Sequence, residues 1–150
     1  MKKNMKQLFG YAEELFRCGL GPDEIYKYIL MEFYGTPYIW GGSLPMGSDC
    51  SGSVCTAMSL ATGRTVRVTA DGLYRKFFTE DVKDFGRSGF IYAAFFLDSE
   101  GKAVHVAGWS DGSFMNVSRN EPNGKGNFRS MGELMRLYPH LHIRLRGMRI

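Results

Sequence analysis

The sequence contains few cysteines, and their number and spacing exclude two classes of protein. Of its 150 residues only Cys18, Cys50 and Cys55 carry a thiol. An odd number of cysteines without paired or metal-ligand spacing argues against a disulfide framework and against a zinc site. We therefore expect free thiols, no metal and no cofactor.

The sequence also lacks long apolar runs and concentrated charge of one sign. No segment approaches the about 20 consecutive apolar residues of a membrane-spanning helix, so we expect no membrane partner. The 19 Lys and Arg against 15 Asp and Glu give a net charge of +4. These charges are spread in ones and twos except in the C-terminal segment RLYPHLHIRLRGMRI, where alternating Arg usually marks a solvated face. We therefore expect no nucleic-acid partner. Repeats, linkers and low-complexity segments are absent, so we predict one domain over residues 1–150 and expect a monomer.

The first residues, MKKNMKQLFGYAEELF, place charges among apolar side chains. They lack the unbroken apolar core and the small-residue cleavage site of a signal peptide. We expect synthesis in the cytoplasm without a signal peptide, so export would need another route.

Hydrophobic spacing changes between the two halves of the chain, and this change predicts an α+β fold. Helical spacing dominates the first half, where predicted helices cover residues 5–16, 22–33, 50–61 and 70–78. In the second half, turns separate four predicted strands, FIYAAFFL, KAVHVAGW, FMNVS and HIRLRGMRI. Ser130 and Glu133 form a capping box that predicts one more helix. The pattern is typical of N-terminal helices packed on a mostly antiparallel sheet.

The segment SDCSG, residues 48–52, makes Cys50 a candidate nucleophile. With Asp49 as N-cap, Cys50 becomes the first residue of the predicted helix. The helix dipole favours an anion there, so we expect a thiol pKa below its usual value. Cys50 shares a helical stripe with Val54 that should turn toward the sheet. Cys55 lies on another side of the helix and is interpreted as a packing residue.

A hairpin in the second half brings a histidine and an amide to one face of the sheet. Asp111 and Gly112 suit a two-residue type I′ turn, which would pair Ala107 with Asn116. Since alternate residues share a face, His105 and Asn116 become diagonal neighbours at about 7–8 Å, within reach of side chains. Asn116 can thus orient the imidazole.

Together these residues predict a Cys-His-Asn triad. A lone histidine in a strand is more often a core or edge residue, and an asparagine near a turn usually serves the turn. A thiol at a helix start, a facing histidine and an amide on the histidine's face form the papain-like arrangement. His140 and His142 are competing bases, but they flank the end of a helix and have no obvious orienting group.

The most specific motifs of the chain are YGTPYIWGGSLPMGSDCSG, HVAGW and MNVS, between Tyr34 and Ser118. At this spacing they resemble the NlpC-type cell-wall endopeptidases, a bacterial branch of the papain-like cysteine peptidases. The resemblance implies a papain-like fold. It also implies hydrolysis of peptidoglycan stem peptides, commonly between γ-D-glutamate and a diamino acid.

The resemblance further implies a role for each site residue. Cys50 would attack the amide carbonyl and form a thioester, while His105 moves the proton and Asn116 orients His105. The backbone N–H of Cys50 and the hydroxyl of Tyr38 would stabilise the oxyanion. The implied substrate-binding residues are Asp49, which would receive a free amino group, Ser51, and Trp40 in the groove.

Other interpretations stay open at this point. The same triad could serve an amidase or an acyltransferase on a substrate outside the wall. A binding module could also keep the fold without catalysis. Since no signal peptide is expected, an enzyme would reach the wall after lysis or on a particle, as a phage or prophage lysin or a tail component does.

Overall fold

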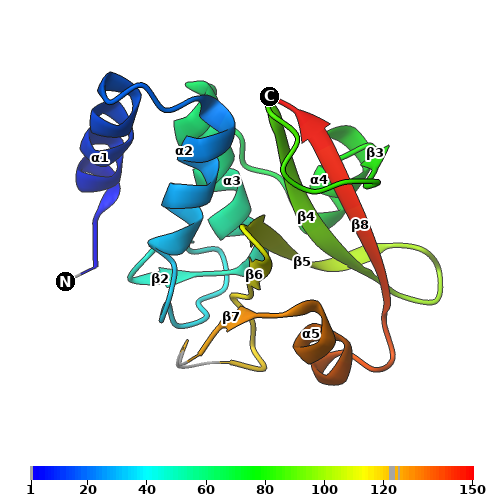
Figure 1. The fold of residues 1–150 in the computed structure, drawn as a ribbon. Helices are drawn as coiled ribbons and strands as arrows, with labels where there is room; N and C mark the ends of the chain where they lie inside the picture. Colours follow the sequence, from blue (N-terminus) through cyan, green and yellow to red (C-terminus); the bar gives the residue numbers. More distant parts are fainter. Residues whose placement is uncertain (1, 122–123, 125) are drawn as a thin grey trace.

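Helices and sheet lie side by side in the molecule (Figure 1). The structure, a computed structural model, describes residues 2–121, 124 and 126–150. Helices α1 (Met5–Arg17), α2 (Pro22–Met31) and α3 (Cys50–Thr62) lie on one side, and the larger sheet lies on the other. This arrangement confirms the predicted α+β class, with N-terminal helices packed on a mostly antiparallel sheet.

Local capping explains where these helices begin. A capping box opens α1, and α2 starts with Pro22 at its first position. Asp49 caps α3, which ends at Gly63 with φ of 75°. The predicted bounds of α1 and α3 agree with the structure to within one residue. Helix α2 ends at Met31, before the predicted residue 33, because the chain continues in tight turns.

Within the described residues, the larger sheet has six strands in the order β3-β8-β4-β5-β6-β7, and every neighbouring pair is antiparallel. Their bounds are β3 (Glu80–Asp81), β4 (Phe90–Leu97), β5 (Ala103–Ser110), β6 (Ser113–Met115), β7 (Phe128–Arg129) and β8 (His142–Arg149). Every residue of β4 is buried, as predicted for an apolar run in a central strand covered on both faces.

The shortest elements were not predicted. These are β3, β7 and a ribbon of β1 (Ser43–Leu44) with β2 (Gly47–Ser48). Each has two residues, which is too few for an alternating pattern to be recognised. Helix α4 (Ala70–Lys76) ends before the predicted residue 78, and α5 (Met131–Leu137) begins at its predicted capping box. No described helix is long and apolar enough to cross a membrane.

The two faces of the sheet differ in what covers them. Val106 and Met115 pack with buried side chains of the helices, including α3. Ala107 and Phe96 lie on the opposite, aromatic face, which α5 covers. His105 lies on this aromatic face, since its ring is 4.9 Å from that of Phe96. The prediction that His105 faces Cys50 from the same face of the sheet was therefore wrong, because α3 packs on the opposite face. The thiol can approach the imidazole only around the edge of β5.

Candidate active site

Glycines allow the loop before α3 to lie against the first turn of the helix. A Cβ on Gly52 would be 2.1 Å from the carbonyl oxygen of Gly42, and a Cβ on Gly42 would be 2.5 Å from that of Gly47. Neither distance leaves room for a side chain. Gly42 of WGGS and Gly52 of SDCSG are therefore required by the close approach of two backbones, which places this loop beside Cys50.

Asp49 holds the start of α3 through several hydrogen bonds. Its carboxylate accepts from the backbone N–H groups of Gly52 at 2.7 Å and Gly41 at 3.0 Å. Arg67 donates to both carboxylate oxygens, at 3.3 and 3.2 Å, and to the hydroxyl of Ser51 at 3.2 Å. The sequence did not point to Arg67, which lies in an irregular segment. A substrate amine at Asp49 would have to share the carboxylate with this guanidinium.

Cys50 is the first residue of α3, as predicted, and is partly exposed. The backbone N–H of Val106 in β5 faces its sulfur and favours the thiolate. The pairing of β5 with β6 ends at Gly108 and Met115, so β6 does not cover Val106. The thiol therefore lies at the uncovered edge of β5, beside the residue that follows His105.

Burial shifts the pKa of Cys50 in the direction opposite to the predicted one. Removal from water raises the pKa of the Cys50 thiol to about 11, with a smaller contribution from the Asp49 carboxylate. Burial also lowers the pKa of the His105 imidazole to about 4, although its bond to Asn116 acts in the other direction. Both groups are therefore neutral near pH 7 in the free protein. The predicted low thiol pKa was wrong because it considered the helix dipole without the loss of solvation.

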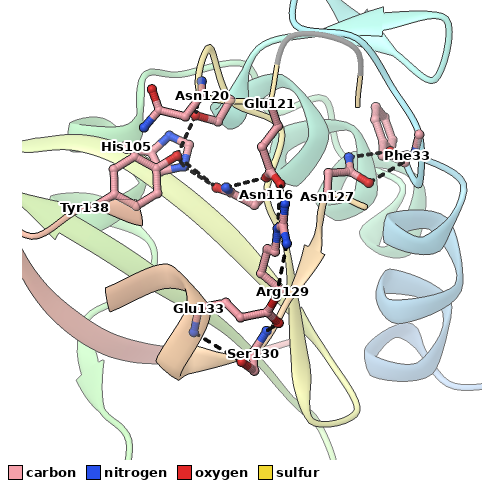
Figure 2. A network of polar contacts seen from close by, with 12 residues as sticks. Phe33, His105, Asn116, Asn120, Glu121, Asn127, Arg129, Ser130, Glu133 and Tyr138 are labelled. Carbon is pink, nitrogen blue, oxygen red and sulfur yellow. Dashed lines mark hydrogen bonds and ion pairs between the residues drawn. The ribbon is translucent and has the colours of Figure 1, made fainter. Parts of the chain in front are cut away.

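The structure brings His105 and Asn116 together (Figure 2). Nε2 of His105 lies 2.6 Å from Oδ1 of Asn116, and both side chains are buried. The predicted pairing of Ala107 with Asn116 does not form, because β6 ends at Met115. The N–H of Asn116 donates instead to the carbonyl of Asn127 at 2.8 Å. The predicted contact between the imidazole and the carboxamide is therefore present, although the ladder that was expected to position Asn116 is not.

Tyr138, the C-cap of α5, covers His105 and was not predicted from the sequence. The Tyr138 and Phe96 rings each lie 4.9 Å from the imidazole. The Tyr138 hydroxyl is 3.2 Å from Nε2 of His105 and donates to Ser118. Burial raises the pKa of Tyr138, so this hydroxyl stays protonated. The two rings shield the buried imidazole from water on the aromatic face.

The loop before α3 carries the other predicted site residues, Tyr38 and Trp40. Tyr38 forms a β-bridge with Ser48, which fixes it beside the start of α3. The guanidinium of Arg119 lies 5.3 Å from the ring centre of Tyr38 and 5.9 Å from that of Trp40. Trp40 is 78% exposed. The loop thus offers aromatic surface next to a cation, and this cation, Arg119, follows Asn116 closely in the sequence.

Known proteins share this architecture. No model of a protein family matches the sequence. A stretch of 43 residues is 49% identical to Protein P54 of Enterococcus faecium, which is 29% of this chain but 7% of that protein. NlpC1 from Trichomonas vaginalis superposes with a TM-score of 0.62 at 23% identity over 85% of this chain. The NlpC/p60 domain of the peptidoglycan hydrolase SagA superposes with a TM-score of 0.60 at 21% identity over 87%. The chain has the NlpC/P60 fold.

The extent of these similarities differs between the proteins. The chain covers 44% of NlpC1 and 100% of the SagA domain. The NlpC/P60 fold is thus present over most of this chain, whereas Protein P54 and NlpC1 are considerably longer.

The remaining candidates of the sequence are Cys55 on α3, His140, and His142 at the start of β8. Cys55 is buried, and its thiol faces the carbonyl of Val68 at 3.5 Å, which agrees with a packing role. His140 and His142 are exposed. Among residues 2–121, 124 and 126–150, no group of three or more His, Cys, Asp or Glu side chains could hold a metal ion.

Proposed function

We propose that the protein hydrolyses an amide bond in peptidoglycan stem peptides, between γ-D-glutamate and a diamino acid, through Cys50, His105 and Asn116. The proposal depends on one observation above all: the imidazole of His105 is bonded to Asn116 at the edge of β5 where Cys50 also lies. The fold adds support, since the peptidoglycan hydrolase SagA contains a domain of this fold. Residues 1–150 would act as one catalytic domain.

The reaction starts from a neutral thiol and a neutral imidazole. As the sulfur of Cys50 attacks the carbonyl carbon, Nδ1 of His105 takes the thiol proton, while Nε2 stays bonded to Asn116. The C–N bond then breaks, and the imidazolium returns the proton to the leaving amine. Water attacks the resulting thioester with Nδ1 as base, which gives a carboxylate product and restores the thiol.

The start of α3 supplies charge stabilisation for the oxyanion. The N–H of Cys50 belongs to the first helical residue, which has no partner within the helix. Such a donor contributes about 3–4 kcal/mol to the transition state of acyl transfer. We assign the second donor to the hydroxyl of Tyr38. Substrate binding would involve Asp49 with its partner Arg67, together with Ser51 and Trp40.

Digestion of purified cell walls tests the proposal. We expect the wild type to release fragments with new amino termini, detected by mass spectrometry, and a defined muropeptide to be cut at one bond. Cys50→Ala should release none. Cys18→Ala is the matched control, because Cys18 is exposed and is the C-cap of α1. Full activity of Cys50→Ala would contradict the proposal.

A binding module is the second candidate, and the neutral state of Cys50 and His105 favours it. Such a module would sediment with cell walls without releasing fragments, and Cys50→Ala would bind as well as the wild type. An acyltransferase would transfer the stem peptide to an added amine instead of water. The product masses therefore separate all three activities.

Delivery to the wall after lysis or on a particle belongs to the same proposal. Recovery of the protein from the medium of intact cells would contradict it.

A further inference from the structure

We propose that Glu121 is a positioning residue that determines, through Asn116, which nitrogen of His105 carries the proton. Figure 2 shows the three side chains in a continuous chain of hydrogen bonds. Nδ2 of Asn116 donates to Oε2 of Glu121 at 2.7 Å, and Oδ1 of Asn116 meets Nε2 of His105 at 2.6 Å. The catalytic consequence of this chain rests on the proposed function, whereas the protonation pattern does not.

The carboxylate of Glu121 determines the orientation of the Asn116 amide. A carboxylate only accepts hydrogen bonds, so the NH2 group of Asn116 must face Glu121 and its oxygen must face His105. Since an amide oxygen also only accepts, Nε2 of His105 must carry the proton. The neutral ring then has its lone pair on Nδ1, which is the nitrogen that the proposed reaction uses as base.

Arg129 pairs with the buried carboxylate of Glu121. The side chain of Glu121 is only 3% exposed, and the guanidinium of Arg129 in β7 bonds its other oxygen, Oε1. Arg129 also pairs with Glu133 of α5 at 3.0 Å. A guanidinium only donates, so its bond to Oε1 leaves Oε2 as the acceptor for the NH2 group of Asn116.

Replacement of Glu121 by glutamine tests this chain because it adds a donor without changing the size of the side chain. Arg129 only donates, so the carbonyl of Gln at this position must face Arg129 and its NH2 must face Asn116. Asn116 must then turn over and present its own NH2 to His105. We expect Glu121→Gln to shift the imidazole from the Nε2–H to the Nδ1–H tautomer.

Ring ¹⁵N chemical shifts of labelled histidine at pH 7.5 report the tautomer, and His105→Gln identifies the signal. Glu133→Gln is the matched control, because Glu133 contacts the same Arg129 but not Asn116. It also preserves the capping box, which accepts Glu or Gln. We expect Glu133→Gln to keep the wild-type tautomer and activity.

In the proposed reaction, Glu121→Gln should lower kcat about 100-fold with KM unchanged, because the base faces away from the thiol. A wild-type Nδ1–H tautomer, or an unchanged tautomer in Glu121→Gln, would overturn the inference. If that variant does not fold, Glu121→Met removes the acceptor without adding a donor and should give both tautomers. If neither variant folds, the ring ¹⁵N shifts of wild-type His105 still test the inference, because they report whether Nε2 or Nδ1 carries the proton. A tautomer switch in a protein that cleaves no cell wall would contradict only the proposed function.

Discussion

The pH dependence of Cys50 alkylation tests whether the resting thiol and imidazole are neutral. Iodoacetamide is uncharged and reacts with the thiolate, so its rate follows the thiolate fraction. We would measure the rate at Cys50 between pH 5 and pH 10 by peptide mass spectrometry. The exposed Cys18 of the same molecule serves as an internal reference.

The expected rate follows from the raised pKa. With a pKa of about 11, about 3 in 10,000 Cys50 side chains are thiolate at pH 7.5. An unperturbed thiol with a pKa of about 8.5 is about one tenth thiolate at this pH, so the difference in thiolate is about 300-fold. A thiolate of higher pKa is about 10-fold more nucleophilic, which offsets part of this difference. Cys50 should therefore react about 30-fold more slowly than an unperturbed thiol.

The shape of the pH–rate profile of Cys50 distinguishes a neutral pair from an ion pair more clearly than the rate at one pH. A neutral pair predicts that the logarithm of the Cys50 rate rises with unit slope up to pH 10 and that His105→Gln leaves this slope unchanged. A thiolate–imidazolium pair predicts a plateau from about pH 5 to pH 8 that disappears in His105→Gln. Observation of that plateau would refute the argument that burial outweighs the helix dipole at Cys50.

Three further changes have predictable effects on stability. Gly52→Ala puts a Cβ 2.1 Å from the Gly42 carbonyl oxygen, so it should lower the free energy of unfolding by about 3 kcal/mol in urea. Gly10→Ala, in open space on α1, should instead raise it slightly, and equal effects at the two sites would contradict the close approach. Asn127→Ala removes hydrogen bonds of 2.9 and 3.0 Å to the backbone after α2 and should cost about 2–3 kcal/mol in the same assay; an unchanged midpoint would rule out this anchoring role. Because the pKa of His105 is about 4 when folded and 6.5 unperturbed, the unfolded chain binds the proton first, and stability is lost as pH falls from 6.5 toward 4. Between pH 7.5 and pH 4.5 the wild type should lose about 2–3 kcal/mol more than His105→Gln, and parallel losses would show that His105 is not buried in its neutral form.

Local chemistry made the helix starts and the hairpin turn predictable. Asp49 caps α3 by accepting from Gly52, three residues along the chain. Asp111 and Gly112 have φ of 46° and 102°, the positive values that a type I′ turn requires. Such signals lie within adjacent residues and are visible in the sequence. The turn also fixes the pairing from Ser110 with Ser113 to Gly108 with Met115, whereas Asn116 lies beyond this ladder and bonds Asn127.

Contacts between distant segments could not be predicted in this way. Tyr138 reaches His105 across 33 residues, and Arg67 reaches Asp49 across 18. Glu121 lies in a loop without periodic pattern, so nothing in its neighbours indicates that it is buried. The error in the predicted pKa of Cys50 has the same origin. The helix dipole is a local property, whereas burial depends on how separate segments pack around the thiol.

One break in strand pairing links the two halves of the candidate site. If β6 continued to pair Asn116 with Ala107, the edge of β5 next to Val106 would be covered and Cys50 could not approach it. A backbone N–H that leaves a ladder needs another acceptor when it is buried, and the carbonyl of Asn127 supplies it to Asn116. The end of the ladder at Met115 therefore leaves Val106 without a partner in β6, and it frees Asn116 to meet the imidazole. A change in the loop that follows β6 should alter the access to the thiol and the orientation of the imidazole together, because neither can be set without the other.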